Sequence, residues 1–117
     1  MQVQIRTDKH IEGGEALADH VRTVVEKTLY HYAERVSRVE VHLSDLNADK
    51  SGTHDHNCTM EARPKGMDPV AASHRAGNVH QAVDGAAKSL ANLLRSRFGK
   101  LDDRQGAPKL PFKEGEV

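Results

Sequence analysis

Two segments near the start of the chain alternate apolar and polar residues. In residues 2–6, Val3 and Ile5 lie between polar neighbours, which is typical of a strand with one buried face. Residues 36–46 show the same period over a longer stretch, and we expect its inward side chains to be Val39, Val41 and Leu43. The opposite parity there carries Arg38, Glu40 and His42, so this face of the predicted strand is polar.

Two further strands are predicted later in the chain. Residues 54–63 form the third, and residues 70–76 form a weaker fourth strand. The sequence PKGMDP at 64–69 has turn chemistry and predicts a hairpin between them. The expected inward residues of the pair are Cys58, Met60, Ala62, Val70, Ala72 and His74.

Helical periodicity appears in two longer segments. Residues 15–33 carry an apolar stripe at three- and four-residue spacing, formed by Leu17, Val21, Val24, Val25, Leu29 and Tyr32. A second helix is predicted to end near Leu101, with the stripe Val79, Val83, Ala86, Ala87, Leu90, Leu94 and Phe98. Asn78 precedes it as a good N-cap residue, with Gln81 in the capping-box position.

The predicted element order is β-α-β-β-β-α. One four-stranded sheet covered by two helices on one face is a two-layer α+β sandwich, and we expect this domain to span residues 1–101. Residues 102–117 contain two prolines and two glycines among charges without periodicity, so we expect a mostly disordered C-terminal tail.

Composition narrows the class of protein. The chain has 17 basic and 17 acidic residues, so its net charge does not predict strong attraction to nucleic acid, although a local basic face remains compatible with it. The single cysteine, Cys58, favours a reducing, cytoplasmic location. Neither a signal peptide nor an apolar run long enough to span a membrane is visible.

Several segments, in order along the chain, resemble one known family. They are MQVQI at the N-terminus, Glu15-Ala16-Leu17, Tyr32, RVSRVEVHL at 35–43, AVDG at 82–85, and Leu90, Leu94 and Lys100-Leu101 in the last helix. Together they resemble the short ribosome hibernation-promoting factor and ribosome-associated inhibitor family, also called the sigma-54 modulation protein family. The resemblance covers residues 1–101 and implies an α+β sandwich without the second, dimerising domain of the long members.

The resemblance also implies a function. Members of this family bind the decoding region of the small ribosomal subunit, contact its rRNA through basic residues, and silence idle ribosomes in stationary phase or stress. It implies a cytoplasmic protein without cofactor, small-molecule substrate or catalytic activity, and we expect a monomer. The candidate RNA-binding residues are Lys27, Lys88, Arg95, Arg97, Lys100, Arg22 and Arg75.

Physical reasoning from the residues supports part of this set. Lys88, Asn92 and Arg95 have the spacing of one outer helix face, and Arg97 and Lys100 flank it. The competing interpretation is a solvated helix face with cations favoured by the helix dipole. For Arg63, Lys65 and Arg75, protection of a sheet edge is slightly favoured over phosphate contact.

Two other functions stay open. Where the family usually has basic or aromatic residues, this chain has Ser89, Asn92-Leu93 and His80, which allows a protein-interaction module that has lost ribosome binding. His54, His56 and Cys58 alternate on one strand and carry zinc-ligand chemistry, but no established zinc spacing is present and Cys58 is predicted to be a core residue. No catalytic motif and no phosphate-binding loop is found.

Overall fold

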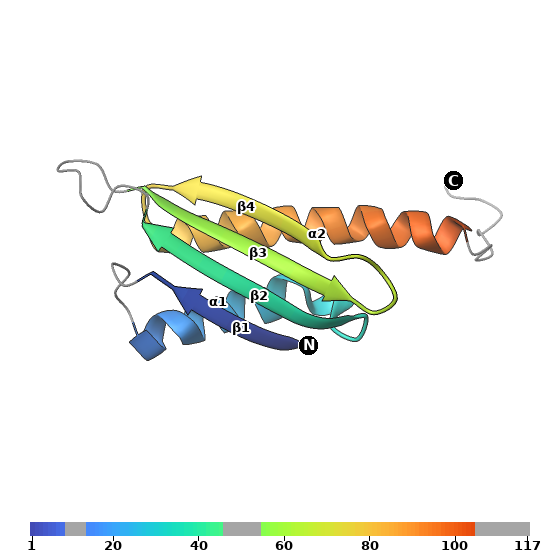
Figure 1. Ribbon diagram of the computed structural model, residues 1–117, viewed down its shortest axis with the longest axis horizontal. Coiled ribbons are helices and arrows are strands. Elements are labelled where there is room, and N and C mark those ends of the chain that lie inside the picture. Colours follow the sequence, from blue (N-terminus) through green and yellow to red (C-terminus); the bar gives the residue numbers. More distant parts are fainter. Residues whose placement is uncertain (9–13, 46–54, 105–117) are drawn as a thin grey trace.

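The computed structural model describes residues 1–8, 14–45 and 55–104. These residues form a four-stranded sheet with two helices (Figure 1). In chain order the elements are β1 (Gln2–Thr7), α1 (Gly14–Thr28), the single 3₁₀ turn η1 (Tyr30–Tyr32), β2 (Val36–Asp45), β3 (His56–Pro64), β4 (Val70–Ala76) and α2 (Val79–Arg104). None of the described helices combines the length and apolar composition that a membrane crossing needs.

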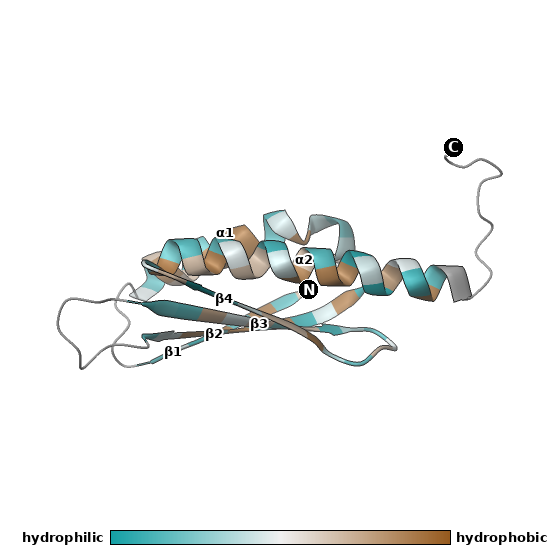
Figure 2. Ribbon diagram, turned by 90° about the horizontal axis from the view of Figure 1, so that it is seen from above, coloured by the Kyte–Doolittle hydropathy of each residue, from teal (hydrophilic) through white to brown (hydrophobic). Residues whose placement is uncertain are grey.

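The sheet has the strand order β1-β2-β3-β4. β1 runs parallel to β2 and reaches it through α1, whereas β2, β3 and β4 follow one another as antiparallel neighbours. Both helices lie on the same face of the sheet, and the other face is open (Figure 2). The predicted β-α-β-β-β-α sandwich is therefore confirmed, together with the hairpin between β3 and β4.

The core lies between the sheet and the helices, as the alternation predicts. The three inward residues of β2 and those of β3 are at most 1% exposed. They meet the apolar stripes of the helices, whose buried members are Leu17, Val21, Val25, Leu29, Ala82, Val83, Ala86, Ala87, Leu90, Leu94 and Phe98. No polar or charged residue within the described ranges is fully buried, so this core is held by apolar burial at about 1.5–3 kcal/mol for each large aliphatic side chain.

The first helix ends earlier than its apolar stripe predicts. The α-helical pattern stops at Thr28, and the chain then tightens into η1 through hydrogen bonds from Tyr32 N to Leu29 O (2.9 Å) and from Ala33 N to Tyr30 O (3.3 Å). This 3₁₀ turn places the Tyr32 ring against Phe98 of α2, with ring centroids 5.5 Å apart. The apolar stripe continues from α1 into η1 because a residue three positions further along lies near the same side in both an α-helix and a 3₁₀ helix.

The second helix is longer than predicted. It continues to Arg104 rather than ending near Leu101, because no helix-breaking residue intervenes and Arg35 holds Asp102 through an ion pair of 3.2 Å. The predicted tail is therefore wrong for residues 102–104, which are helical. The rest of the predicted tail, residues 105–117, lies outside the described residues, as does His54 at the expected start of the third strand.

Candidate nucleic-acid interface

The last helix presents a row of cations away from the sheet. Asn78 caps its start, where the Asn78 Oδ1 atom accepts a hydrogen bond of 2.8 Å from the backbone N–H of Gln81. From there the buried stripe fixes the rotation of the helix, so that Lys88 and Arg95 are exposed on its outer side. The Arg95 Nη2 atom donates to Asn92 Oδ1 at 3.0 Å, so these two residues share one face, as their spacing predicts.

The two helices run parallel, which brings a cation of α1 beside this row. His20 of α1 contacts His80 near the start of α2, with ring centroids 4.3 Å apart, while Tyr32 contacts Phe98 farther along. Lys27 follows His20 by seven residues, two helical turns, and therefore lies on the same side of α1. The two cross-contacts place Lys27 at the level of α2 between Lys88 and Arg95, across the seam of the helices.

Five of the seven candidate cations have no acidic partner among the described residues. Arg22 pairs with Asp19 at 3.6 Å and Arg75 pairs with Asp55 at 3.0 Å. The other five belong to the helices and make no ion pair with a described carboxylate; they are Lys27, Lys88, Arg95, Arg97 and Lys100. Residues 85–101 of α2 contain four of these cations and no acid, so positive charge in this stretch is locally uncompensated.

Arg75 does not belong to this face. It lies on β4 with a parity opposite to the inward Val70, and thus on the open side of the sheet. The expectation that Arg75 protects a sheet edge agrees with this place, because β4 is an edge strand. The same expectation is wrong for Arg63, which belongs to the inner strand β3.

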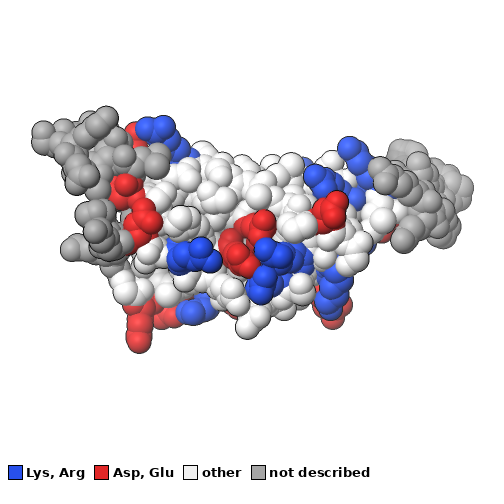
Figure 3. All heavy atoms as spheres, in the orientation of Figure 1, with Lys and Arg blue, Asp and Glu red and all other residues white. Residues whose placement is uncertain are grey.

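In the middle of the open face, on β2 and β3, charged side chains pair with one another. Arg38 pairs with Glu40 at 2.8 Å, and Arg63 pairs with both Glu40 (3.4 Å) and Glu61 (2.9 Å). Figure 3 views this face and shows basic and acidic side chains intermixed among uncharged ones. The two faces of the domain therefore differ in kind, since the described cations without acidic partners concentrate on the helix layer.

Among the described residues, His56 and Cys58 of β3 belong to no cluster that could hold a metal ion. Cys58 is fully buried, and burial raises the pKa of its thiol to about 12, so the sulfur stays protonated and enclosed. In residues 1–8, 14–45 and 55–104, no three His, Cys, Asp or Glu side chains lie close enough together to hold a metal ion. Of the proposed triad, His54 falls outside this part of the chain.

A family model described as "Sigma 54 modulation protein / S30EA ribosomal protein" matches residues 3–102. The chain belongs to this family. The match spans all seven elements of the fold, and it confirms the resemblance seen in the sequence. No curated protein sequence matches the chain significantly.

Solved structures share the fold of this S30EA family member at low sequence identity. The crystal structure of the Thermus thermophilus Protein Y N-terminal domain has a TM-score of 0.67 and 17% identity, covering 84% of this chain and 99% of that one. A ribosomal subunit interface protein from Coxiella burnetii has a TM-score of 0.63 and 14% identity, covering 85% and 99%. At such identities the likeness establishes the common architecture alone and assigns no role to individual residues of this chain.

Two features of this family member were missed in the sequence. Arg35 lies over the Phe98 ring at 3.9 Å and pairs with Asp102, so it fastens the end of α2 to the η1–β2 junction. On the hairpin, Met67 and Asp68 face Arg97 and Lys100 across a pocket. Both features join positions more than 25 residues apart, and periodicity within single elements carries no signal for such pairs.

The tyrosines are placed as the sequence predicts. Tyr32 packs against the core, and Tyr30 is 73% exposed at the surface of η1. The Tyr30 ring contacts His31, with centroids 5.7 Å apart.

Proposed function

We propose that this protein binds the small ribosomal subunit at its decoding region and inhibits translation by occupying the sites of tRNA and mRNA. The observation that carries the proposal is the contrast between the two faces of the domain. Five cations on the helix layer lack acidic partners among the described residues, whereas Arg38 and Arg63 on the open face are neutralised by Glu40 and Glu61. Membership of a ribosome-associated family supports the same direction.

The seam between the helices is the expected centre of the contact. Lys27 approaches it from α1, and Lys88 and Arg95 border it on α2. Structured RNA is recognised largely through phosphates and 2′-hydroxyls, so a row of Lys and Arg without a base-reading motif suffices to dock a domain. Arg97 and Lys100 lie on another side of α2, where they line a pocket with the β3–β4 hairpin, so they would contact RNA beside the row rather than within it. Arg22 contributes less because Asp19 already neutralises it.

Inhibition requires no chemistry beyond occupancy. The protein acts as a monomer in the cytoplasm, without cofactor, small-molecule substrate or catalytic step, and it stores idle ribosomes under stress or in stationary phase. A domain that fills the decoding channel excludes tRNA and mRNA sterically, so its effect follows from its affinity.

Co-sedimentation with purified small subunits at low and moderate salt tests the proposal. Binding should weaken as salt rises, because each neutralised phosphate releases condensed counterions. The double variant Lys88→Glu/Arg95→Glu should bind weakly at both salts and reduce the slope of log affinity against log salt by about 2. Arg6→Glu is a control for reversal of one charge elsewhere, since Arg6 is an exposed cation on the open face.

Two outcomes would contradict the proposal. If the double variant and the control bound equally well, the helix layer would not be the docking face. If the native protein did not sediment with subunits at either salt, the alternative of a protein-interaction module without ribosome binding would be favoured instead.

A further inference from the structure

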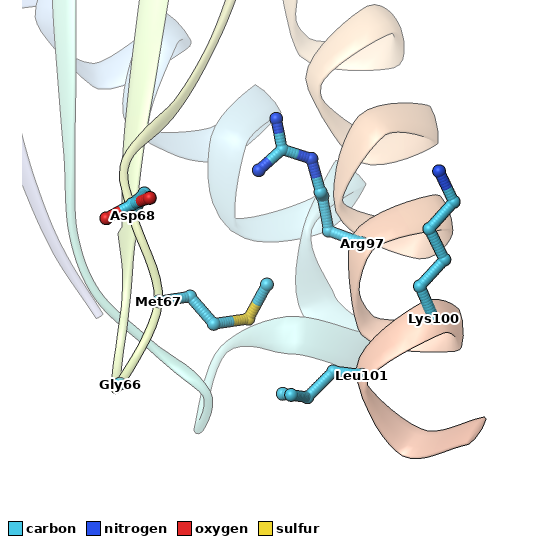
Figure 4. Close-up of a pocket in the computed structure, with 6 residues that line it drawn as sticks. All are labelled: Gly66, Met67, Asp68, Arg97, Lys100 and Leu101. Carbon is cyan, nitrogen blue, oxygen red and sulfur yellow. The ribbon is translucent and has the colours of Figure 1, made fainter. Parts of the chain in front are cut away.

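A pocket of about 650 Å³ lies between the β3–β4 hairpin and the last turns of α2. Gly66, Met67 and Asp68 form the hairpin wall, and Arg97, Lys100 and Leu101 form the helix wall. Figure 4 shows the Met67 side chain extending from the hairpin toward the helix and Arg97 reaching toward the hairpin. This volume lies within the range of small-molecule and cofactor sites.

A tight turn builds the hairpin wall. The Met67 N–H donates to Pro64 O at 3.4 Å, and Gly66 takes a φ of 74°, a left-handed conformation that glycine adopts without strain. The turn directs Met67 inward, where it packs against the core while still lining the pocket. On the other wall, Leu101 is half-buried, so both walls offer apolar surface beside charged groups.

Groups of opposite charge line this space without pairing. Arg97 and Lys100 are three residues apart on α2, and neither makes an ion pair with a described carboxylate. Asp68, on the opposite wall, likewise makes no ion pair with a described cation. The pocket thus presents a hydrogen-bond acceptor on one side, donors on the other, and apolar contacts from Met67 and Leu101.

Guanine matches this arrangement better than the other bases. Its N1–H and N2–H groups are two parallel donors for one carboxylate, and its O6 and N7 atoms are acceptors for Arg or Lys. Adenine and cytosine offer a single exocyclic amino group beside a ring-nitrogen acceptor, and uracil offers one ring N–H between two carbonyl oxygens. The thioether of Met67 can lie against an aromatic base, and the remaining cation is available for a phosphate.

We infer that this pocket binds an unpaired guanine nucleotide, with Asp68 on the N1–H/N2–H edge, Arg97 on O6 and Lys100 on the phosphate. The nucleotide is either a residue of single-stranded RNA or a free nucleotide. In the RNA case the inference rests on the proposed ribosome binding. It adds selectivity for one base to phosphate contacts, which do not discriminate between bases.

Fluorescence anisotropy with the full chain tests the inference. The probes are short oligouridines that carry a single central guanosine, adenosine or cytidine, or uridine alone, with free GMP as a competitor. The guanosine oligomer should bind about tenfold more tightly than the others. Asp68→Asn should abolish this preference, because an amide cannot accept two parallel N–H donors, whereas Asp19→Asn removes the same charge from α1 and should preserve it.

Equal affinity for the four oligomers would overturn the inference, as would a guanosine preference that survives in Asp68→Asn. Competition by GMP would show that a free nucleotide suffices. A guanosine preference without competition would assign the site to RNA.

The two experiments distinguish failure of the proposed ribosome binding from failure of the guanine pocket. If the protein failed to sediment with small subunits but preferred guanosine, the pocket would stand and ribosome binding would not. If it sedimented normally without a base preference, only the pocket would be refuted.

Discussion

Gly85 of α2 lies against His74 of β4, and its replacement by alanine makes a quantitative prediction. A Cβ atom at this position would lie 2.1 Å from Cδ2, 2.3 Å from Cγ and 2.5 Å from Nε2 of the His74 ring. These separations are far below the 3.5–4.0 Å of ordinary carbon contacts. Because Cγ itself is too close, rotation of the ring about χ2 cannot relieve the clash, and His74 must change χ1 or the helix must shift.

Two opposing effects set the magnitude. Alanine is favoured over glycine in a helix interior by about 1 kcal/mol. Overpacking costs about 1–3 kcal/mol in a well-packed core, and this range is an upper bound here because His74 is exposed and can move into solvent. Gly85→Ala alone should therefore lower the free energy of unfolding by up to about 2 kcal/mol. In a His74→Ala background the clash is absent, and the same change should raise it by about 1 kcal/mol.

Urea denaturation of four proteins, followed by far-UV circular dichroism, measures this cycle. The four are the native chain, both single variants and the double variant, and a coupling energy of up to about 3 kcal/mol is expected between the two positions. Equal stabilisation by Gly85→Ala in both backgrounds would refute the reasoning. It would mean that the imidazole does not occupy the space above Gly85.

Two further results are expected. Asn78→Ala should lower the free energy of unfolding by about 1 kcal/mol in the same denaturation assay, because Gln81 N loses its capping acceptor, and an unchanged midpoint would contradict the cap. Cys58 should resist iodoacetamide in the folded protein and react in urea. Folding raises the pKa of the Cys58 thiol from 9.0 to about 12, so the contribution of the neutral thiol to the free energy of unfolding is fully present below pH 9 and should be lost between pH 9 and 12. Cys58→Ser should remove this contribution to the pH dependence.

Most of the fold could be predicted because its strands are half-buried and its helices amphipathic. The alternation of Val39, Val41 and Leu43 identifies the inward face of β2 without any knowledge of its neighbours. The change at Thr28 and the extension of α2 to Arg104 could not be predicted. Both depend on tertiary contacts, Tyr32 with Phe98 and Arg35 with Asp102, that have no counterpart in local periodicity.

The candidate site was predictable only in part. Helical spacing correctly places Lys88 and Arg95 on one exposed face. Helical spacing does not indicate which cations are neutralised by acids. Arg75 pairs with Asp55 on the other side of the sheet, and the sequence alone could not distinguish it from the other candidate RNA-binding residues. The role of Lys27 depends on the parallel packing of the helices, which becomes visible only through the contacts of His20 and Tyr32. RNA contact by all seven residues stays a prediction.

Because α1 and α2 pack in parallel, charged side chains are distributed unevenly along the helix layer. The five helix cations without acidic partners, Lys27, Lys88, Arg95, Arg97 and Lys100, all lie beyond the first two turns of their helices, and residues 85–101 of α2 carry no acid. A chain with no net charge can thus carry a local excess of positive charge on its helix layer. The electric field of a polyanion orients such a molecule before contact. Its association rate should therefore fall as ionic strength rises, even though its overall charge is zero.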